Sequence, residues 1–318
     1  MKKITILIAL TTLVLASSCR KVVEFSGSQT DPLPVLICQS EAEQPISLRL
    51  TYSHFFLRQA VFPVIDNATI LADLNGNTDV AQFSYRENGI YHSGLALRPD
   101  DTLTLRIIVP NQGELTAGCR MPALPASSDF TISSEFNYQS SPSYENPRDT
   151  IYIFSNENLD FQFTLHDPAN IDNYYCLRAY YLDSNNNRRY FTLNINDNLI
   201  FEQDPTADYF GINSQNDYSS GQQIIFSDDR INGLDHTLKG SVDFISNYVF
   251  HKKDKLYLEV SSLSRDMYLY LVTLNKQRQS GDILSIINEP VQIHSNVNGG
   301  IGILGACSRA SVLFPINF

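Results

Sequence analysis

The sequence predicts a mainly β protein, and three observations support that fold class. Short runs rich in β-branched and aromatic residues recur along most of the chain, and most of them alternate apolar and polar positions. Turn sequences such as Asn75-Gly76 and residues 87–89 separate several of these runs, as in β-hairpins. One segment, 265–277, has the 3.6-residue periodicity of a helix instead. We therefore expect an N-terminal β-sandwich followed by a larger β-rich domain that carries one α-helix.

The chain begins with the pattern of a lipoprotein signal peptide. Two lysines precede an apolar segment at 4–16, which is too short to span a bilayer as a helix, and small residues then lead to Cys19. In bacterial lipoproteins a cysteine at this position receives a diacylglyceryl thioether and becomes the N-terminus. Each acyl CH₂ in the bilayer contributes about 0.8 kcal/mol, so three chains tether a protein firmly. We expect removal of residues 1–18 and lipidation of Cys19, the alternative being cleavage near Ala16 and secretion.

Residues 19–32 are polar and contain Pro, Gly and Ser, so we expect a tether between the membrane and the first domain. The β-sandwich domain is expected at 33–122, where many short strands follow one another closely. Its predicted strands are 33–39, 46–52, 68–74, 81–85, 89–93, 102–109 and 115–120. The hairpin pattern at 89–105 is of the kind found in immunoglobulin-like and transthyretin-like modules. Such modules are mostly scaffolds, so the pattern predicts no chemistry.

The domain boundary is predicted within residues 121–128, where two prolines and small residues follow the last strand of the sandwich. A C-terminal β-rich domain is then expected at 126–318. Its predicted strands are 130–135, 150–154, 160–166, 174–182, 189–195, 222–226, 237–244 and 255–261. A helix at about 265–277 follows, because Ser264 can serve as N-cap and the apolar residues Met267, Tyr270, Leu271 and Leu274 share one face. We expect this face to pack on the second sheet.

Composition excludes one class of partner. The 318-residue chain has a formal net charge of −11 and no cluster of Lys and Arg, whereas phosphate backbones require such clusters. We therefore expect no nucleic acid. Acidic surfaces keep secreted proteins soluble, so the charge names no other partner.

Four cysteines remain once Cys19 is lipidated. None is spaced as a C-x-x-C metal site, and disulfides persist in exported proteins. If each domain holds one bridge, Cys38 pairs with Cys119 and Cys176 with Cys307. Four buried free thiols are the alternative.

No catalytic motif is found. The six histidines are isolated from one another in sequence, so we expect no metal site. Residues 300–305 match G-x-G-x-x-G, but no βαβ unit or later acidic residue accompanies them, so these glycines are expected at tight turns or close backbone contacts before a final strand. The acid pairs Asp100-Asp101 and Asp228-Asp229 are expected in turns, bonded to local backbone. We expect no cofactor and no enzymatic activity.

Two loops have the composition of contact surfaces. Segments 133–149 and 203–221 mix aromatic rings with Ser, Asn and Gly, which suits binding because rings give contact area at little entropy cost. The candidate binding residues are Phe136, Tyr138, Tyr144, Tyr209, Phe210 and Tyr218. Polar surface loops with incidental tyrosines are the alternative.

Four segments resemble a family of lipoproteins from Bacteroidota known as domain of unknown function 4249. They are residues 167–175, residues 226–233, the predicted helix at 268–277, and residues 289–306, in which an Asn and a Gly-rich turn precede a terminal strand. Members are commonly encoded beside TonB-dependent outer-membrane receptors. The resemblance implies a lipid-anchored outer-membrane protein that assists uptake, and it transfers no catalytic residue.

The function expected from these observations is non-catalytic: an accessory subunit that binds a TonB-dependent transporter or its ligand. A structural adhesin or envelope-assembly protein is the second hypothesis, and an unrecognised hydrolase is the third. Surface-exported lipoproteins of that phylum often carry acidic residues just after the lipidated cysteine, whereas this chain has Arg20-Lys21 and then Glu24. The surface and the periplasmic face of the membrane therefore both stay open.

Overall fold

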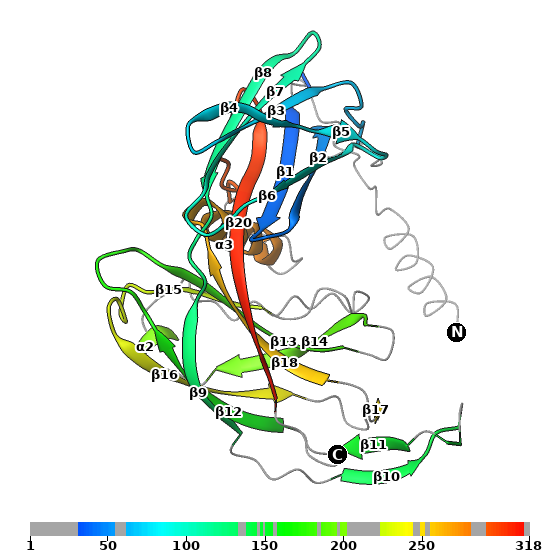
Figure 1. Ribbon diagram of the computed structural model, residues 1–318, viewed down its shortest axis with the longest axis vertical. Coiled ribbons are helices and arrows are strands. Elements are labelled where there is room, and N and C mark those ends of the chain that lie inside the picture. The colour runs from blue at the N-terminus through cyan, green and yellow to red at the C-terminus, as the bar shows by residue number, and fades with distance from the viewer. Residues whose placement is uncertain are drawn as a thin grey trace, which may run out of the picture. The chain divides into compact units, whose positions relative to one another are not determined.

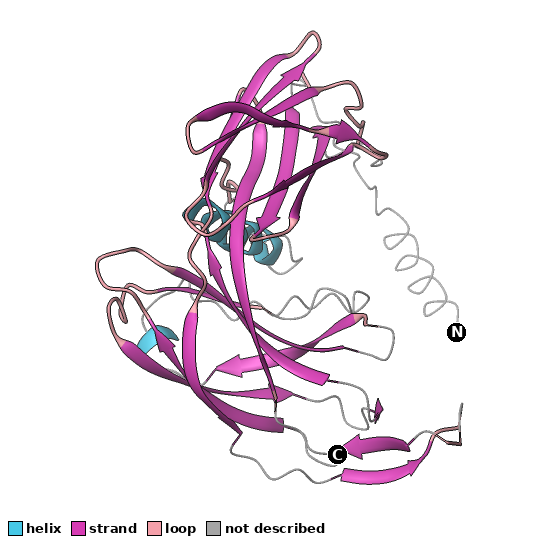
Figure 2. Cartoon of the chain, viewed as in Figure 1, coloured by secondary structure: helices cyan, strands magenta, loops and turns pink. Residues whose placement is uncertain are grey.

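A computed structural model describes residues 31–54, 62–132, 138–144, 147–148, 150–154, 158–182, 186–195, 198–201, 223–243, 249–251, 255–280 and 291–314. Strands dominate these residues (Figure 2), and the mainly β prediction is confirmed. The elements are β1 (Pro34–Glu41), β2 (Pro45–Tyr52), β3 (Thr69–Leu74), β4 (Asn77–Gln82), β5 (Ser84–Tyr85), β6 (Ile90–Ala96), β7 (Thr102–Val109), β8 (Gly113–Arg120), β9 (Ala126–Ile132), β10 (Tyr138–Pro142), β11 (Thr150–Phe154), β12 (Asn158–His166), β13 (Tyr174–Leu182), β14 (Arg188–Ile195), α2 (Asn198–Phe201), β15 (Ile224–Ser227), β16 (Asp235–Asp243), β17 (Val249–His251), β18 (Lys255–Leu263), α3 (Arg265–Ser280), β19 (Val297–Asn298) and β20 (Ile301–Leu313).

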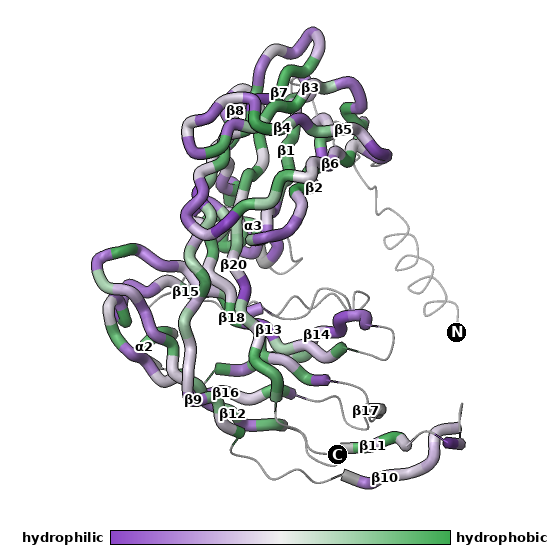
Figure 3. Tube along the Cα trace, in the orientation of Figure 1, coloured by the Kyte–Doolittle hydropathy of each residue, from purple (hydrophilic) through white to green (hydrophobic). Residues whose placement is uncertain are grey.

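A first core lies between two sheets formed mainly by the N-terminal strands. One layer has the order β5-β6-β2-β1-β20 and the other the order β19-β8-β7-β3-β4. Alternating residues of β1, β2, β7 and β8 point inward, and their apolar side chains form one buried cluster. The alternation that predicted these strands is therefore the alternation that buries them. Along the chain the polar residues gather at the turns (Figure 3).

β20 connects the two cores. Its first half pairs in parallel with β1, from Val35 opposite Ile301 to Glu41 opposite Cys307, and its second half pairs in antiparallel with β18. In Figure 1 this red strand runs from the N-terminal strands to the C-terminal ones. Val297, Leu304 and Ala306 belong to the first core. The sequence-based boundaries assigned these residues to the C-terminal domain, because strand pairing between distant segments leaves no local signal.

The sheet that contains β1 and β20 continues beyond β20 through strands β18, β13, β14, β16, β12 and β9. These strands enclose a second apolar core. β13 has two partners along one edge: its first half pairs with β15 and its second half with β14. The inward residues of β12 and β13 include Phe161, Phe163 and Tyr175, all nearly inaccessible to solvent. A small sheet of β10, β11 and β17 completes the described strands, and Tyr152 of β11 joins the second core.

The predicted helix is confirmed as α3, which is three residues longer than the predicted range. Ser264 caps it, since the backbone N–H of Met267 lies 3.4 Å from the Ser264 hydroxyl. Met267, Tyr268, Leu271 and Val272 pack with Cys176 of β13 and Cys307 of β20 in a third apolar cluster. The helix therefore covers part of β13 and β20 on the face of the sheet that points away from the second core.

Several predicted strand limits differ from the structure. The predicted strand 81–85 is divided at Phe83, whose side chain enters the first core, and β4 begins earlier, at Asn77. β10 occupies part of the predicted loop 133–149 and pairs with β11. β20 begins at Ile301, so Gly302 and Gly305 lie inside the final strand and do not precede it.

Candidate functional site

Two buried aspartates fix the loop that leads from β12 to β13. Asp228, 1 % exposed, accepts hydrogen bonds from the Asn173 backbone N–H at 2.9 Å and from the Asn232 side chain at 3.1 Å. Asp167 accepts one from the Tyr175 hydroxyl at 2.6 Å and one from the Gly233 N–H at 2.8 Å. The segments 167–175 and 226–233 are thereby held against each other. Burial raises the pKa of the Asp228 carboxyl, and the hydrogen bond from Asn173 opposes that rise.

The two acid pairs that the sequence placed in turns differ in the reach of their contacts. Asp101 bonds local backbone as expected, accepting from the Arg98 N–H at 2.7 Å, and it also accepts from the Asn75 side chain at 2.7 Å. Asp228 holds the backbone of Asn173, 55 residues away in sequence. A long-range partner of this kind cannot be recognised from sequence spacing.

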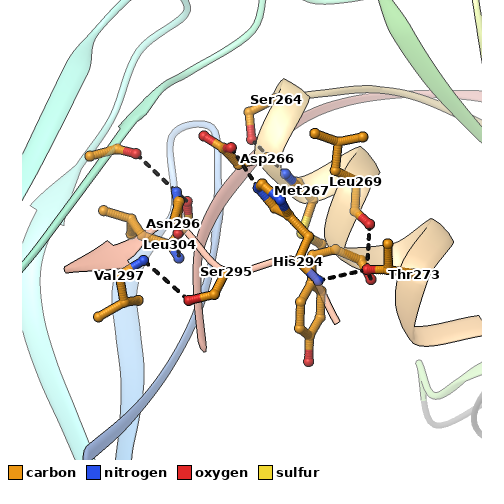
Figure 4. A network of polar contacts seen from close by, with 12 residues as sticks. Ser264, Asp266, Met267, Leu269, Thr273, His294, Ser295, Asn296, Val297 and Leu304 are labelled. Atoms are coloured by element: carbon orange, nitrogen blue, oxygen red, sulfur yellow. Dashed lines mark hydrogen bonds and ion pairs between the residues drawn. The ribbon is translucent and has the colours of Figure 1, made fainter. Parts of the chain in front are cut away.

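A second polar network joins the start of α3 to the segment before β20 (Figure 4). His294 Nε2 lies 2.8 Å from the Asp266 carboxylate, and the His294 N–H donates to the Thr273 hydroxyl at 2.8 Å. Ser264 accepts from the Ala306 N–H of β20 at 3.1 Å while it caps the helix. The first turn of α3 is therefore fixed to both neighbouring segments.

Asn296 joins the two layers of the first sandwich (Figure 4). Its side-chain amide donates to the Leu304 carbonyl at 3.0 Å and to the Gly118 carbonyl of β8 at 3.1 Å, and its oxygen accepts from the Leu304 N–H at 2.9 Å. The neighbouring Ser295 hydroxyl accepts from the Gly302 N–H at 3.1 Å. The polar residues before the glycine-rich segment thus hold the beginning of β20 in place.

The glycines of 300–305 permit close backbone contacts, as predicted. A Cβ on Gly300 would lie 2.6 Å from the Pro34 carbonyl oxygen, and one on Gly305 would lie 2.6 Å from the Met267 sulfur. Gly302 has φ of +122°, and a Cβ there would lie 1.9 Å from the Leu36 oxygen. These contacts let β1 and α3 approach β20 from two directions, and nothing about them concerns a nucleotide.

A cavity of about 380 Å³ opens where these fixed segments meet. Its lining comes from the end of β8, the linker that follows, the loop before β13, the end of β18 and the first turn of α3. The residues are Asp100, Cys119, Arg120, Met121, Pro122, Ala123, Pro168, Ile171, Asp172, Asn173, Tyr174, Ser262, Leu263, Ser264, Arg265 and Asp266. We call this the junction cavity. Its volume is in the range of small-ligand sites.

Several charged groups of the junction cavity have fixed partners. Arg120 contacts Asp100 at 3.0 Å within the lining, and Asp266 contacts His294, which lies outside the lining. Tyr174 stacks on Tyr268 with ring centroids 4.6 Å apart. Burial raises the pKa of the Tyr174 hydroxyl, and its hydrogen bond with Arg265 opposes that rise. Met121 and Leu263 provide a buried apolar floor, so the cavity combines apolar surface with oriented polar groups.

One serine, one histidine and one aspartate form a hydrogen-bonded chain elsewhere. His166 Nε2 lies 2.8 Å from the Ser128 hydroxyl, and its Nδ1 lies 2.6 Å from Asp235. These distances suit a nucleophile and base. However, 38 % of the His166 side chain and 74 % of the Asp235 side chain are exposed, and Ser128 also bonds Asp129 at 2.8 Å. Water around such a chain weakens the electrostatic effects on which acyl transfer depends.

The sequence-predicted site residues fall into two groups. Cys19, Phe136, Tyr209, Phe210 and Tyr218 lie outside the described residues. Tyr138 begins β10, opposite Phe154, and Tyr144 is fully exposed at 100 %. Tyr144 does not line the junction cavity.

The four cysteines of the described chain are free and buried. β18 lies between β13 and β20, so Cys176 and Cys307 are two strand spacings apart, about 9.5 Å. A disulfide needs Cα atoms within about 7 Å, so this geometry does not accommodate the second predicted bridge. Cys38 and Cys119 lie on facing sheets in the first core. Burial raises the pKa of the Cys38 thiol to about 11 and raises that of Cys119.

The described residues contain no group of three His, Cys, Asp or Glu side chains arranged to hold a metal ion. Among the same residues, no helix has both the length and the apolar character needed to cross a bilayer.

Fold and cavity together define a class: a mainly β protein with two apolar cores that share one strand, and with a small polar-rimmed cavity where fixed loops meet. The profile of the family described as domain of unknown function (DUF4249) matches residues 21–312. The chain belongs to this family. No curated protein matches it. Three of the segments that carried the resemblance in the sequence lie at the junction cavity or hold its walls. Segment 167–175 lines the cavity, Asp228 of 226–233 holds that segment, and His294 bonds Asp266 at the start of α3 and Thr273 within it.

Proposed function

We propose that this protein is a lipid-anchored outer-membrane lipoprotein without catalytic activity. It acts as an accessory subunit that binds a TonB-dependent transporter or the ligand of that transporter. The N-terminal pattern that ends at Cys19 supports the anchor, and membership of the family supports the setting. The anchor holds the folded part of the chain within reach of other envelope proteins.

The observation that carries the binding proposal is the construction of the junction cavity. Its loops are fixed by buried side chains, and among its charged groups Arg120 pairs with Asp100 while Asp266 is held by His294. A preformed cavity of this kind binds at low ordering cost. Polar side chains of the cavity that are held by hydrogen bonds to fixed partners suit ligand binding better than acid–base catalysis.

A pair of matched variants tests the cavity. Ile171 lines it and is 58 % exposed, while Leu234 lies on the neighbouring turn, is 52 % exposed and does not line it. Ile171→Asp should reduce co-purification of the lipoprotein with an outer-membrane receptor at least fivefold, because it places a charge on an apolar wall. Leu234→Asp should leave co-purification unchanged. Equal recovery of both variants with the receptor would remove the cavity from the proposed function.

The aromatic loops are proposed as a second contact region. Deletion of 203–221 should weaken the same co-purification while circular dichroism and thermal unfolding stay close to wild type. Unchanged recovery would remove this loop from the binding surface. Mass spectrometry of the mature protein tests the anchor directly: a polypeptide lacking acyl mass, free in the medium, would contradict it.

The Ser128–His166–Asp235 chain is the observation that would favour a hydrolase. A fluorophosphonate probe distinguishes the two functions, because it phosphonylates an activated serine, whose oxygen attacks phosphorus and displaces fluoride. We expect no labelling of Ser128 in the native protein. Labelling that disappears in His166→Ala would replace the non-catalytic proposal.

A further inference from the structure

A charged cluster lies on the outer face of the second sheet, beyond the rows that α3 covers. The register places Arg178 of β13 opposite Glu259 of β18, and Glu259 opposite Ser311 of β20. On the same face, one neighbouring row pairs Tyr180 with Tyr257. The neighbouring row on the other side of the Arg178–Glu259 pair contains Arg309. We call Arg178, Arg188, Glu259 and Arg309 the arginine cluster. It shares no residue with the junction cavity.

Glu259 is buried at the centre of this cluster, with 1 % of its surface exposed. Its Oε2 atom accepts from Arg188 Nη1 at 3.2 Å and lies 3.9 Å from Arg309 Nη1. Its Oε1 atom is buried and has no hydrogen-bond partner within the described part of the chain. A buried carboxylate oxygen without a donor is unfavourable and calls for one.

Within the residues that the structure describes, Arg178 has a buried hydrogen-bond donor without a partner, where Glu259 has a buried acceptor without one. Its Nη2 group donates to the Gln223 side-chain oxygen, while its Nε–H is buried and unpartnered among the described residues. Arg178 and Glu259 are direct cross-strand neighbours, so the unused donor and the unused acceptor belong to two residues that are paired in the register. A hydroxyl group suits such a pair, since it donates and accepts at once.

The surrounding charge is positive. Among the described residues, the three guanidinium groups of the cluster lie with two carboxylates, Glu259 and Glu41, the latter 3.3 Å from Arg309. The cluster can be reached from solvent, because 41 % of the Arg188 side chain and 25 % of the Arg309 side chain are exposed. Guanidinium groups bind carboxylates in paired geometry, so this surplus favours an anionic ligand.

Tyrosine rings adjoin the same groups. Arg188 lies over the Tyr180 ring at 4.8 Å, and Tyr180 stacks on Tyr257 with centroids 5.3 Å apart. Arg178 lies 5.7 Å from the centre of the Tyr190 ring. Aromatic rings beside paired charges offer an apolar surface next to fixed polar groups, a combination typical of sites for small polar ligands.

We infer that the arginine cluster binds a hydroxylated carboxylate, specifically an acidic sugar residue of the uronic acid class. One hydroxyl bridges Glu259 Oε1 and Arg178 Nε, the sugar carboxylate pairs with Arg188 and Arg309, and the ring lies toward the tyrosine row. Arg188 bonds Glu259 and is 41 % exposed, so the ligand meets this side chain from solvent. An amino acid zwitterion fits less well, because its ammonium group would enter among three guanidinium groups.

This inference goes beyond the proposed function, since it names a ligand class at a site separate from the junction cavity. Binding at the arginine cluster can fail while receptor co-purification persists, and the reverse also holds. The two proposals are therefore tested independently.

The experiment is calorimetric titration of the full lipoprotein in detergent micelles with trigalacturonate. The comparison ligands are neutral galactotriose, free glutamate and inorganic sulfate. Arg188→Gln and Glu259→Gln should each weaken trigalacturonate binding about tenfold or more, as expected for loss of a charge-assisted hydrogen bond. Arg189→Gln, a change at the adjacent position on the opposite face of β14, is the matched control and should bind as wild type.

The outcomes separate the alternatives. Selective binding of trigalacturonate that is lost in Arg188→Gln supports the inference, and this exposed substitution guards against a folding defect in Glu259→Gln. No heat with trigalacturonate, equal affinity for sulfate, preference for glutamate, or wild-type binding by Arg188→Gln would each overturn it.

Discussion

At the scale of single residues, several buried or half-buried polar groups of this protein act over long distances in sequence. Asp228, Asn296 and Glu259 each bond segments that the chain visits far apart. Asp229, the neighbour of Asp228, instead accepts a hydrogen bond from the hydroxyl of Ser227, two residues away. Residue type and spacing therefore predict the local turn at Asp228-Asp229. Only the fold determines which of these two aspartates bonds a distant segment.

Asp228→Ala tests this selection. The change leaves the Asn173 N–H and the Asn232 amide without their acceptor, so we expect a loss of about 2–4 kcal/mol in the free energy of unfolding. Asp229→Ala, the matched control, should cost less than about 1 kcal/mol. Urea unfolding followed by circular dichroism measures both. Equal losses would mean that Asp228 does not hold the two loops together.

The buried thiols give a prediction about pH. Burial raises the pKa of the Cys38 thiol from 9.0 to about 11 and raises those of Cys119, Cys176 and Cys307. The folded state therefore keeps protons that the unfolded chain loses near pH 9, so stability is fully present below pH 9 and falls as the pH rises above it. Replacing Cys38 by Ser should flatten this alkaline fall.

Thiol reactivity checks the same groups. At pH 8 the native protein should not react with a disulfide reagent, whereas in denaturant all four thiols should react. Two reactive thiols in denaturant without reductant would indicate that Cys38 and Cys119 are bridged after all.

At the scale of elements, β20 carries more of the fold than any local pattern suggests. It pairs with β1 on one side and β18 on the other, and its glycines admit the Leu36 backbone and the α3 side chain of Met267. α3 in turn is held by its cap and by His294. Residues at the start of α3 line the junction cavity, so substitutions that displace β20 should also change the shape of the cavity.

Gly302→Ala tests the close contact at the start of β20. A Cβ there would meet the Leu36 oxygen, and φ of +122° is unfavourable for alanine, so we expect a loss of about 3 kcal/mol or more in the free energy of unfolding. Gly94→Ala is the control, since a Cβ at Gly94 meets nothing within 4 Å and should change stability by about 1 kcal/mol or less. Similar unfolding midpoints for the two variants would contradict the assigned contact.

At the scale of the whole molecule, the two cores are joined by a shared strand as well as by a linker. The first core includes Val297, Leu304 and Ala306, and the second core includes Phe314, just after β20 ends. Separating the chain at the linker therefore removes side chains from the first core and the parallel partner of β1.

Expression of residues 33–122 alone tests this arrangement. The fragment lacks β19 and the first half of β20, so we expect no cooperative thermal transition. Joining residues 291–307 to it by a flexible linker should restore one. The ends are close enough, because Asn296 already bonds Gly118 of β8. A cooperative transition in the short fragment would show that the first sandwich folds without β20.

The sequence by itself determined the mainly β class, most strand positions, the helix at α3 and the lipoprotein pattern at Cys19, because alternation, helical periodicity and N-terminal composition are local properties. It also limited the glycines of 300–305 to tight turns or close backbone contacts. Only the tertiary structure decided that these glycines admit close contacts inside β20, that β20 belongs to both cores, that Asp228 fixes a loop of the junction cavity, and that Arg178 and Glu259 are cross-strand neighbours with one unused donor and one unused acceptor. These facts depend on which distant strands pair and in which register, and register is set by the burial of whole sheets.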